Sequence, residues 1–308
     1  MSQRKSETKS QAKPATKTEV AAGASPLGGP SPLGGPSPLR AVKGPIVLVG
    51  AGKMGGALLD GWLRLGLDAR KIVVLEPHPS AEVAAQAIGG LRLNPDPAGL
   101  KPEAIVLAVK PQMAPDALPP LAPLVASGAV VISIMAGRTL AFLEQIFGAG
   151  TAAVRAMPNT PASIGRGMTV AVANAAVTPA GRALAQNLLG ATGKVDWVAE
   201  EGLIDAVTAV SGSGPAYVFL LAESLARAGA AAGLPPDLAQ KIARETVAGA
   251  GELLFRSPLD AATLRKNVTS PGGTTAAALD VLMGPDGFDA LLEKAVAAAT
   301  KRSRELAG

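Results

Sequence analysis

The chain has 308 residues, of which 17% are charged and 48% hydrophobic, and its formal net charge is +5. It contains no cysteine, which excludes a disulfide framework, a thiolate nucleophile and a cysteine-ligated metal. Any Ser-His-Asp triad or histidine-based metal site would have to use the single histidine, His78. Most hydrolases and metalloenzymes are therefore disfavoured, and no metal site is expected.

The net positive charge belongs to the first 44 residues. Residues 1–44 contain seven Lys or Arg and two Asp or Glu, whereas residues 45–308 contain 22 of each sign. The ordered part therefore has no overall charge that would attract nucleic acid. No apolar run reaches the ~20 residues needed to span a membrane, so we expect neither nucleic acid nor a membrane as a partner.

The first 44 residues are of low complexity. SPLGGP occurs twice in tandem, at 25–30 and 31–36, after a stretch rich in Lys, Ser, Thr and Gln. Such a composition buries too little apolar surface to offset the entropy of ordering, so we predict a disordered tail over 1–44. The tail lacks the apolar segment of a secretory signal, and we expect a cytoplasmic protein.

Residues 45–200 alternate between apolar strands and helices. The first strand, PIVLVG, begins at Pro45 and is followed by a helical pattern. Further strand-like runs lie at 71–77, 104–111, 130–137, 152–159 and 168–174. Apolar strands that alternate with helices are typical of a parallel sheet covered on both faces. We therefore predict an α/β fold, with a Rossmann-like, doubly wound dinucleotide-binding domain over 45–200.

No strand-like run follows residue 200. Helical patterns occupy 200–234, with an interruption near Ser211–Pro215, and then 235–255, 257–268 and 288–306. The apolar spacing in these segments predicts an all-helical second domain over 201–308, in which small residues permit close helix packing.

A glycine-rich loop joins the first strand to its helix. In VGAGKMGGALL, Gly50, Gly52 and Gly55 have G-x-G-x-x-G spacing directly after a strand. The first glycine allows a tight turn, the second lets the backbone approach a pyrophosphate, and the third allows the helix to pack closely on the strand. The helix start at Lys53 and Met54 would offer its amides to the phosphates. This predicts a nicotinamide dinucleotide cofactor, NADPH or NADH.

The choice between these two cofactors stays open in the sequence. Glu76 ends the second strand, 21 residues beyond Gly55, where an acid would bind the ribose 2′-OH of NAD and repel the 2′-phosphate of NADP. His78, Ser80 and the helix start beside them could instead accept that phosphate, and Lys53 could reach it as well. Glu76 could equally be a solvated loop residue.

Two other strand ends offer polar groups. Ligands of open α/β sheets bind beyond the carboxyl ends of the strands, and the segments AVKPQ and AMPNTP lie there. Their candidate nucleotide-binding residues are Ala108, Val109, Lys110, Pro111, Asn159 and Thr160. Each could be ordinary turn chemistry, but their shared position at strand ends favours function.

A hydroxyl- and glycine-rich turn lies near the carboxyl terminus, within NVTSPGGTTAAALDVL (267–282). It leads into an alanine-rich helix, whose first amides lack intrahelical partners and are suited to an anion. The turn itself, 270–275, contains no His, Cys, Asp, Glu or Lys. Chemistry at this turn would have to proceed without an ionisable side chain.

Together these motifs resemble the pyrroline-5-carboxylate reductase family. The resembling segments include VGAGKMGGALL, LAVKPQ, AMPNTPA, DAVTAVSGSGPAYVFLLAESLA and LRKNVTSPGGTTAAAL, and the resemblance covers residues 45 to about 305. It implies NAD(P)H-dependent reduction of L-1-pyrroline-5-carboxylate to L-proline, the last step of proline biosynthesis. It also implies a homodimer with interlocked helical domains, often assembled into a ring of dimers.

The resemblance further implies the substrate site. Ser270, Gly273 and Thr274 would bind the substrate carboxylate, and Thr275 would be the catalytic residue, hydrogen-bonded to the ring nitrogen. A cyclic imine takes its proton from solvent, which accounts for a site without an acid or base. This sequence departs from the family pattern at Lys53, where Asn is more common, and at Lys266, where an acid is expected.

Two alternatives are weighed against this interpretation. A 3-hydroxyacid dehydrogenase of the 6-phosphogluconate type would carry a catalytic lysine in the first long helix of its second domain, but SGSGPAYVFLLAESLARAG has none. A nucleotide-binding scaffold without catalysis is disfavoured by the intact VTSPGGTT. The SGSG segment at 211–214 either shapes the substrate pocket or permits close packing, and Tyr217 suits packing at least as well as acid catalysis.

Overall fold

The computed structural model describes residues 37–307. The chain divides into two units, Met1–Gly35 and Pro36–Gly308, and all the described residues belong to the second. Most of the predicted disordered tail lies outside the described residues. Its last residues do not belong to a disordered tail, because a short 3-10 helix, η1 (Pro38–Ala41), places Leu39 and Val42 in the core. The predicted start of the ordered chain at residue 45 is therefore too late.

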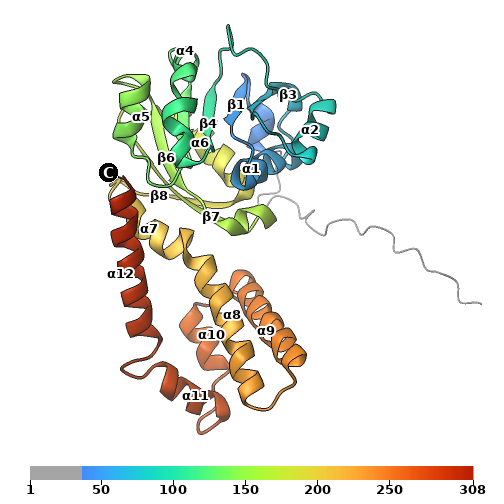
Figure 1. Ribbon diagram of the computed structural model, residues 1–308, viewed down its shortest axis with the longest axis vertical. Coiled ribbons are helices and arrows are strands. Elements are labelled where there is room, and N and C mark those ends of the chain that lie inside the picture. The colour runs from blue at the N-terminus through green and yellow to red at the C-terminus, as the bar shows by residue number, and fades with distance from the viewer. Residues whose placement is uncertain (1–36, 308) are drawn as a thin grey trace, which may run out of the picture. The chain divides into compact units, whose positions relative to one another are not determined.

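Eight strands form a single sheet in the order β3-β2-β1-β4-β5-β6-β7-β8 (Figure 1). The strands are β1 (Ile46–Val49), β2 (Ile72–Leu75), β3 (Arg92–Leu93), β4 (Ala104–Leu107), β5 (Val130–Ser133), β6 (Ala153–Met157), β7 (Gly167–Ala173) and β8 (Gly193–Trp197). All neighbouring strands run parallel except the antiparallel pair β6 and β7. Every residue of β1, β4 and β5 is buried, which is typical of a parallel sheet covered on both faces.

Helices cover both faces of this sheet. The helices α1 (Lys53–Arg64), α2 (Ala81–Ile88) and α6 (Pro179–Leu189) pack on one face. The helices α3 (Ala114–Ala117), α4 (Ala122–Val125) and α5 (Leu140–Phe147) pack on the other. Trp62 of α1 is fully buried, and its indole Nε1 donates to the carbonyl of Leu188 at 2.8 Å, which joins α1 to α6. The predicted doubly wound α/β fold is confirmed.

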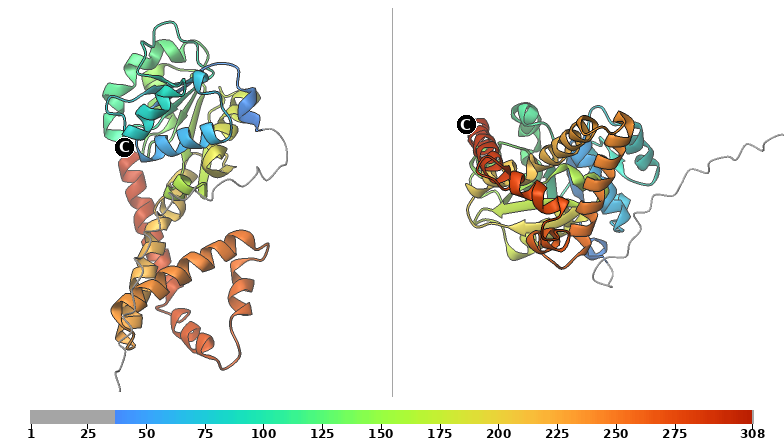
Figure 2. Two further views of the ribbon diagram at one scale, coloured as in Figure 1. Left: turned by 90° about the vertical axis from the view of Figure 1, so that its right-hand side faces the viewer. Right: turned by 90° about the horizontal axis from the view of Figure 1, so that it is seen from below.

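Only helices follow β8 in the described residues. They are α7 (Leu203–Val207), the π-helical turn η7 (Thr208–Gly212), α8 (Gly214–Ala231), α9 (Pro236–Arg256), α10 (Ala261–Asn267), α11 (Thr274–Leu282) and α12 (Phe288–Ala307). Helices α8 and α9 lie side by side (Figures 1 and 2). Helix α12 returns to α7, where Ser303 Oγ donates to Asp205 Oδ1 at 2.7 Å. The all-helical prediction is confirmed, and the boundary at residue 200 stays a prediction.

The helical part exposes much apolar surface. No residue of α8 is buried, and Phe219 and Leu220 are 68% and 55% exposed. Leu203–Ala231 form one continuous helix that is long and apolar enough to cross a membrane by length and composition alone; only 17% of its most apolar window is buried. The helix contains Asp205, Glu223 and Arg227, so it is not an uninterrupted apolar run, and the expectation that no membrane is a partner stays a prediction. Exposed apolar surface of this extent is typical of an interaction site.

Candidate active site

The glycine loop lies at the carboxyl end of β1, between β2 and β4. Gly50 has φ +89°, and a Cβ there would lie 2.9 Å from backbone atoms of Ala108 and Val109. A Cβ on Gly55 would lie 2.1 Å from the carbonyl oxygen of Gly50. The first and third glycines therefore serve the tight turn and the close helix packing that their spacing predicts.

Gly52 differs from its neighbours because the chain leaves space around it. A Cβ on Gly52 would meet no heavy atom within 4 Å. Gly52 is also the N-cap of α1, and no side chain caps this helix start. The amides of Lys53 and Met54 consequently have no intrahelical acceptor. An open glycine before an uncapped helix start fits a pyrophosphate, so these residues can hold the diphosphate of a dinucleotide.

The Glu76 carboxylate is fixed beside the glycine loop. Its Oε2 accepts from the Ala51 amide at 2.9 Å, and its Oε1 accepts from the His78 amide at 3.0 Å. Asn94 holds the backbone of the same residue: its Oδ1 accepts from the Glu76 amide and its Nδ2 donates to the Glu76 carbonyl, both at 2.8 Å. Glu76 is thus a half-buried, oriented group, and the supporting role of Asn94 was not foreseen from the sequence.

The loop after β4 is held by an arginine that sequence reasoning missed. Arg138 donates to the Pro111 carbonyl from Nε at 3.1 Å and from Nη2 at 2.7 Å. Its guanidinium lies over the Phe142 ring, 4.5 Å from the centroid. Ala108 and Val109 are half-buried next to the glycine loop, whereas Lys110 is exposed. The AVKPQ segment therefore has a fixed backbone at the predicted cofactor edge.

Asn159 links the end of β6 to the helical part. Its Oδ1 accepts from the Met168 amide at 2.9 Å, and its Nδ2 donates to Ser211 Oγ at 3.2 Å. A Cβ on Gly212 would lie 2.5 Å from Met157 Cε, so SGSG packs directly against the strand end. The first two residues of this segment end η7, and π-helical turns are frequent at functional sites. Ser211 thereby joins the group of residues at the carboxyl edge of the sheet.

Local structure accounts for the predicted residue Thr160 and for Tyr217, whose role the sequence left open. Thr160 begins a 3-10 helix, η5 (Thr160–Ile164), and its carbonyl accepts from Ser163 Oγ at 3.1 Å. The Tyr217 hydroxyl donates to the Ala209 carbonyl at 3.0 Å, within the helix that contains the π-helical turn. This bond favours a structural role for the tyrosine over acid catalysis.

The SPGGTT turn forms a second uncapped helix start. Gly272 has φ +69°, and the Gly273 amide donates to the Ser270 carbonyl at 3.0 Å. Gly273 is the N-cap of α11 without a side-chain cap, so the amides of Thr274 and Thr275 lack intrahelical acceptors. The Ser270 and Thr274 side chains are exposed, and that of Thr275 is half-buried.

The two uncapped helix starts lie in different parts of the fold. Helix α1 packs against the sheet, whereas α10 and α11 lie beyond α8, away from the sheet (Figures 1 and 2). Within one chain, the glycine loop, Glu76, the AVKPQ backbone and Asn159 therefore lie along the carboxyl ends of the strands. The SPGGTT turn of the same chain lies away from them.

The groups with shifted pKa values lie outside this edge of the sheet. The Arg70 side chain, through hydrogen bonds to the carboxylate, lowers the pKa of Asp68 to about 2. The Thr263 amide lowers the pKa of Asp260, the N-cap of α10. Within residues 37–307, no three His, Asp or Glu side chains are grouped to hold a metal ion.

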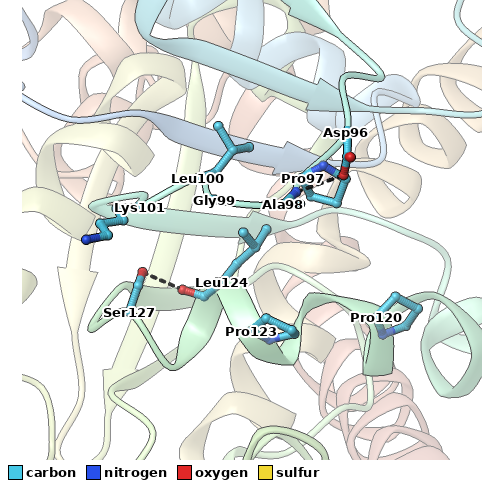
Figure 3. Close-up of a pocket in the computed structure, with 10 residues that line it drawn as sticks. All are labelled: Asp96, Pro97, Ala98, Gly99, Leu100, Lys101, Pro120, Pro123, Leu124 and Ser127. Atoms are coloured by element: carbon cyan, nitrogen blue, oxygen red, sulfur yellow. Dashed lines mark hydrogen bonds between the residues drawn. The ribbon is translucent and has the colours of Figure 1, made fainter.

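A hollow of about 490 Å³ lies at the opposite edge of the sheet (Figure 3). It is lined by residues 96–101, which precede β4, and by Pro120, Pro123, Leu124 and Ser127 around α4. Because β4 runs parallel to β1, the residues before β4 lie at the end of the sheet away from the glycine loop. This hollow contains none of the predicted site residues.

A doubly wound sheet with an open glycine cradle at a helix start defines a dinucleotide-dependent oxidoreductase. Comparison with known proteins agrees with this class. Residues 45–137 match the family described as NADP oxidoreductase, coenzyme F420-dependent, and residues 201–306 match the one described as pyrroline-5-carboxylate reductase dimerisation.

Individual relatives narrow the class. The chain is 40% identical to a pyrroline-5-carboxylate reductase of Pseudomonas aeruginosa over 85% of this chain and 96% of that protein. It is 43% identical to one of Synechocystis, with 84% and 97% covered. The structure of a Coxiella burnetii pyrroline-5-carboxylate reductase aligns with a TM-score of 0.80 at 34% identity, covering 86% of this chain and 99% of that one. The chain belongs to the pyrroline-5-carboxylate reductase family.

A further solved relative contains a nucleotide. The Plasmodium falciparum pyrroline carboxylate reductase with NADP bound aligns with a TM-score of 0.71 at 29% identity, covering 86% of this chain and 98% of that one.

Proposed function

We propose that this protein is an NAD(P)H-dependent pyrroline-5-carboxylate reductase that converts L-1-pyrroline-5-carboxylate to L-proline. The observation that carries the proposal is its two uncapped helix starts. One, at Gly52, suits a pyrophosphate, and the other, at Gly273, suits a carboxylate and has no ionisable side chain in its turn. The 40% identity to the Pseudomonas aeruginosa enzyme over 85% of the chain supports the same function.

Reduction of the imine requires little proton transfer by the protein. When bound, the nicotinamide cofactor supplies a hydride to the imine carbon of the substrate, and the C=N π electrons move to the ring nitrogen. Because that nitrogen has already taken a proton from solvent, the protein needs to orient the ring and hold its carboxylate. The Ser270 hydroxyl and the amides of Thr274 and Thr275 bind the carboxylate; the Gly273 amide, which the resemblance also assigned to it, donates to the Ser270 carbonyl instead. The Thr275 hydroxyl accepts from the ring N–H.

The glycine loop and the strand ends hold the cofactor in this proposal. The Lys53 and Met54 amides bind the diphosphate over Gly52. The backbone at Ala108, Val109, Lys110 and Pro111, together with Asn159, faces the nicotinamide half at the carboxyl edge of the sheet. The fixed geometry of this edge supports the proposal, because Arg138 and Ser211 hold the two loops in place.

We propose that a second copy of the chain completes the site. The separation of the SPGGTT turn from the glycine loop, the exposed apolar face of α8 and the dimerisation match over residues 201–306 support a homodimer. A lipid partner fits α8 less well, because Glu223 and Arg227 form a 2.6 Å ion pair on it. Light scattering after size-exclusion chromatography measures the assembly and distinguishes a dimer from a ring of dimers.

We place the enzyme in the cytoplasm, where a soluble biosynthetic reductase would work. Cell fractionation with activity measured in the soluble and membrane fractions tests this placement. Activity that sediments with membranes after a high-salt wash would contradict it.

The function is tested by steady-state kinetics with pyrroline-5-carboxylate and each reduced nucleotide. Thr275→Ala should lower kcat by about tenfold or more, the scale of a lost positioned hydrogen-bonding group, while Thr275→Ser should retain most of it. Nucleotide affinity should not change in either variant, because Thr275 contacts the substrate ring and not the nucleotide in this proposal. Turnover of Thr275→Ala within twofold of the parent would remove Thr275 from the mechanism.

A further inference from the structure

We propose that Glu76 makes this enzyme selective for NADH over NADPH. The inference rests on the proposed function, because it names the cofactor of the same site. It is carried by the geometry of the Glu76 carboxylate, which is held beside the glycine loop by bonds from the Ala51 and His78 amides.

Glu76 stands where the adenosine ribose of a dinucleotide lies. Leu75, the last residue of β2, pairs with Val49 of β1, and its carbonyl accepts from the Gly50 amide at 2.9 Å. The residue after Leu75 is therefore adjacent to the first glycine of the cradle. When a diphosphate lies on the α1 start, the adenosine ribose reaches the end of β2.

The Glu76 carboxylate can accept further hydrogen bonds besides those from the two amides. Each carboxylate oxygen has about two acceptor positions, and one amide occupies one position on each oxygen. Both oxygens can thus accept from the vicinal hydroxyls of an unmodified ribose. Asn94 fixes the Glu76 backbone from the other side, so the carboxylate is oriented before the nucleotide arrives.

A 2′-phosphate would meet this carboxylate directly. A phosphate monoester carries close to two negative charges at neutral pH and has only acceptor oxygens. It therefore repels Glu76 and offers no donor to it. Because two amides and Asn94 hold the residue, the carboxylate cannot turn away without losing these bonds. Repulsion between Glu76 and the 2′-phosphate would therefore select NADH over NADPH, because like charges that meet only one of two ligands produce specificity.

The surrounding loop offers little to offset the repulsion. Residues 76–82 contain two carboxylates and neither Lys nor Arg. Ser80 Oγ accepts from the Val83 amide as the N-cap of α2, which leaves its O–H as one neutral donor, and Glu82 adds negative charge to the first turn of that helix. The His78 amide donates to Glu76 itself. The loop therefore offers a phosphate the neutral Ser80 hydroxyl but no Lys or Arg to offset two carboxylates, and Lys53 is the cation of the glycine loop.

The test measures nucleotide binding without substrate. Dissociation constants of NADH and NADPH are obtained by fluorescence titration for the parent enzyme, Glu76→Gln, Glu76→Asp and the control Asp116→Asn. Asp116 is exposed on α3, so its variant makes the same change of charge away from the loop. The parent should bind NADH at least about tenfold more tightly than NADPH, and Glu76→Gln should reduce this ratio by about tenfold to a hundredfold.

The other variants separate charge from structure. Glu76→Asp keeps the charge and should keep a preference for NADH, even if its shorter side chain lowers affinity for both nucleotides. Asp116→Asn should leave the ratio within twofold of the parent value. Thermal melting of each variant shows whether the fold is retained, and the Glu76→Asp result decides the matter if Glu76→Gln fails to fold.

Three results would overturn the inference. They are a parent enzyme that binds NADPH as tightly as NADH, a Glu76→Gln ratio within twofold of the parent, and a preference for NADPH in Glu76→Asp. The proposed function fails separately: selective NADH binding without reduction of pyrroline-5-carboxylate would contradict the function and leave the selectivity intact. Turnover of pyrroline-5-carboxylate with a preference for NADPH would support the function and contradict the selectivity.

Discussion

Replacing Gly52 by alanine should weaken nucleotide binding while leaving the fold unchanged. A Cβ at Gly52 meets no heavy atom of the chain within 4 Å, and its φ of −66° and ψ of −166° are open to alanine. The added methyl group would therefore occupy only the space that we assign to the diphosphate.

The expected magnitudes follow from this geometry. Alanine lowers the entropy of the unfolded chain, which stabilises by about 0.4–1 kcal/mol, but it is a poorer N-cap than glycine by a similar amount. The free energy of unfolding should thus change by less than about 0.5 kcal/mol. Against a bound nucleotide, one extra methyl group costs about 1–3 kcal/mol, which corresponds to a dissociation constant roughly tenfold to a hundredfold higher.

Gly55→Ala provides the contrast. Its Cβ would lie 2.1 Å from the Gly50 carbonyl oxygen, and backbone cannot yield as a flexible side chain does. We expect a loss of about 2 kcal/mol or more and a melting temperature lower by about 4–8 °C. Fluorescence titration with NADH and thermal melting measure both effects. If Gly52→Ala binds NADH within twofold of the parent, the cradle does not hold the diphosphate.

Three further predictions concern other contacts. Asn159→Ala removes the acceptor of the Met168 amide and the donor to Ser211 Oγ, and it should cost about 1–3 kcal/mol in urea unfolding; an effect below about 0.5 kcal/mol would contradict this. Phe219→Glu should shift the assembly toward monomer in light scattering, and an unchanged mass would show that α8 is not in the interface. The pKa of Asp68, lowered from 3.8 to about 2, implies stability that is present above about pH 3.8 and lost as the pH falls toward 2. Replacing Arg70 by Gln removes the side-chain hydrogen bonds but keeps the backbone one, so it should reduce this part of the acid dependence.

The sequence predicted the central strands because they are entirely apolar. Strands β1, β4 and β5 are buried at every residue, and a short apolar run bounded by turn residues is typical of such a strand. Strand β8 was missed because it lies at the edge of the sheet, where half-buried and exposed residues alternate and the sequence GKVDW includes two charges. Strand β3 was missed because it has only two residues.

The site was predictable where backbone conformation demands a particular residue. Gly50 and Gly55 could be found because no side chain fits at either position. Asn94 and Arg138 could not be found, since each acts on a backbone group that is distant in sequence, on Glu76 and Pro111 respectively. The π-helical turn was visible only as an interruption near residue 211, because the SGSG segment that overlaps its end suits several turn conformations.

The exposure of helix α8 affects how the chain folds and stays soluble before it associates. None of its 18 residues is fully buried within its own chain, although it packs against α9, so its exposed apolar face is stabilised only when another molecule covers it. Folding of this region is then coupled to association, and the melting temperature should rise with protein concentration. Before it associates, a newly made chain exposes this apolar helix and is prone to aggregate. Cells that make the protein slowly or at low abundance would therefore depend on chaperones to keep the unassociated chain soluble.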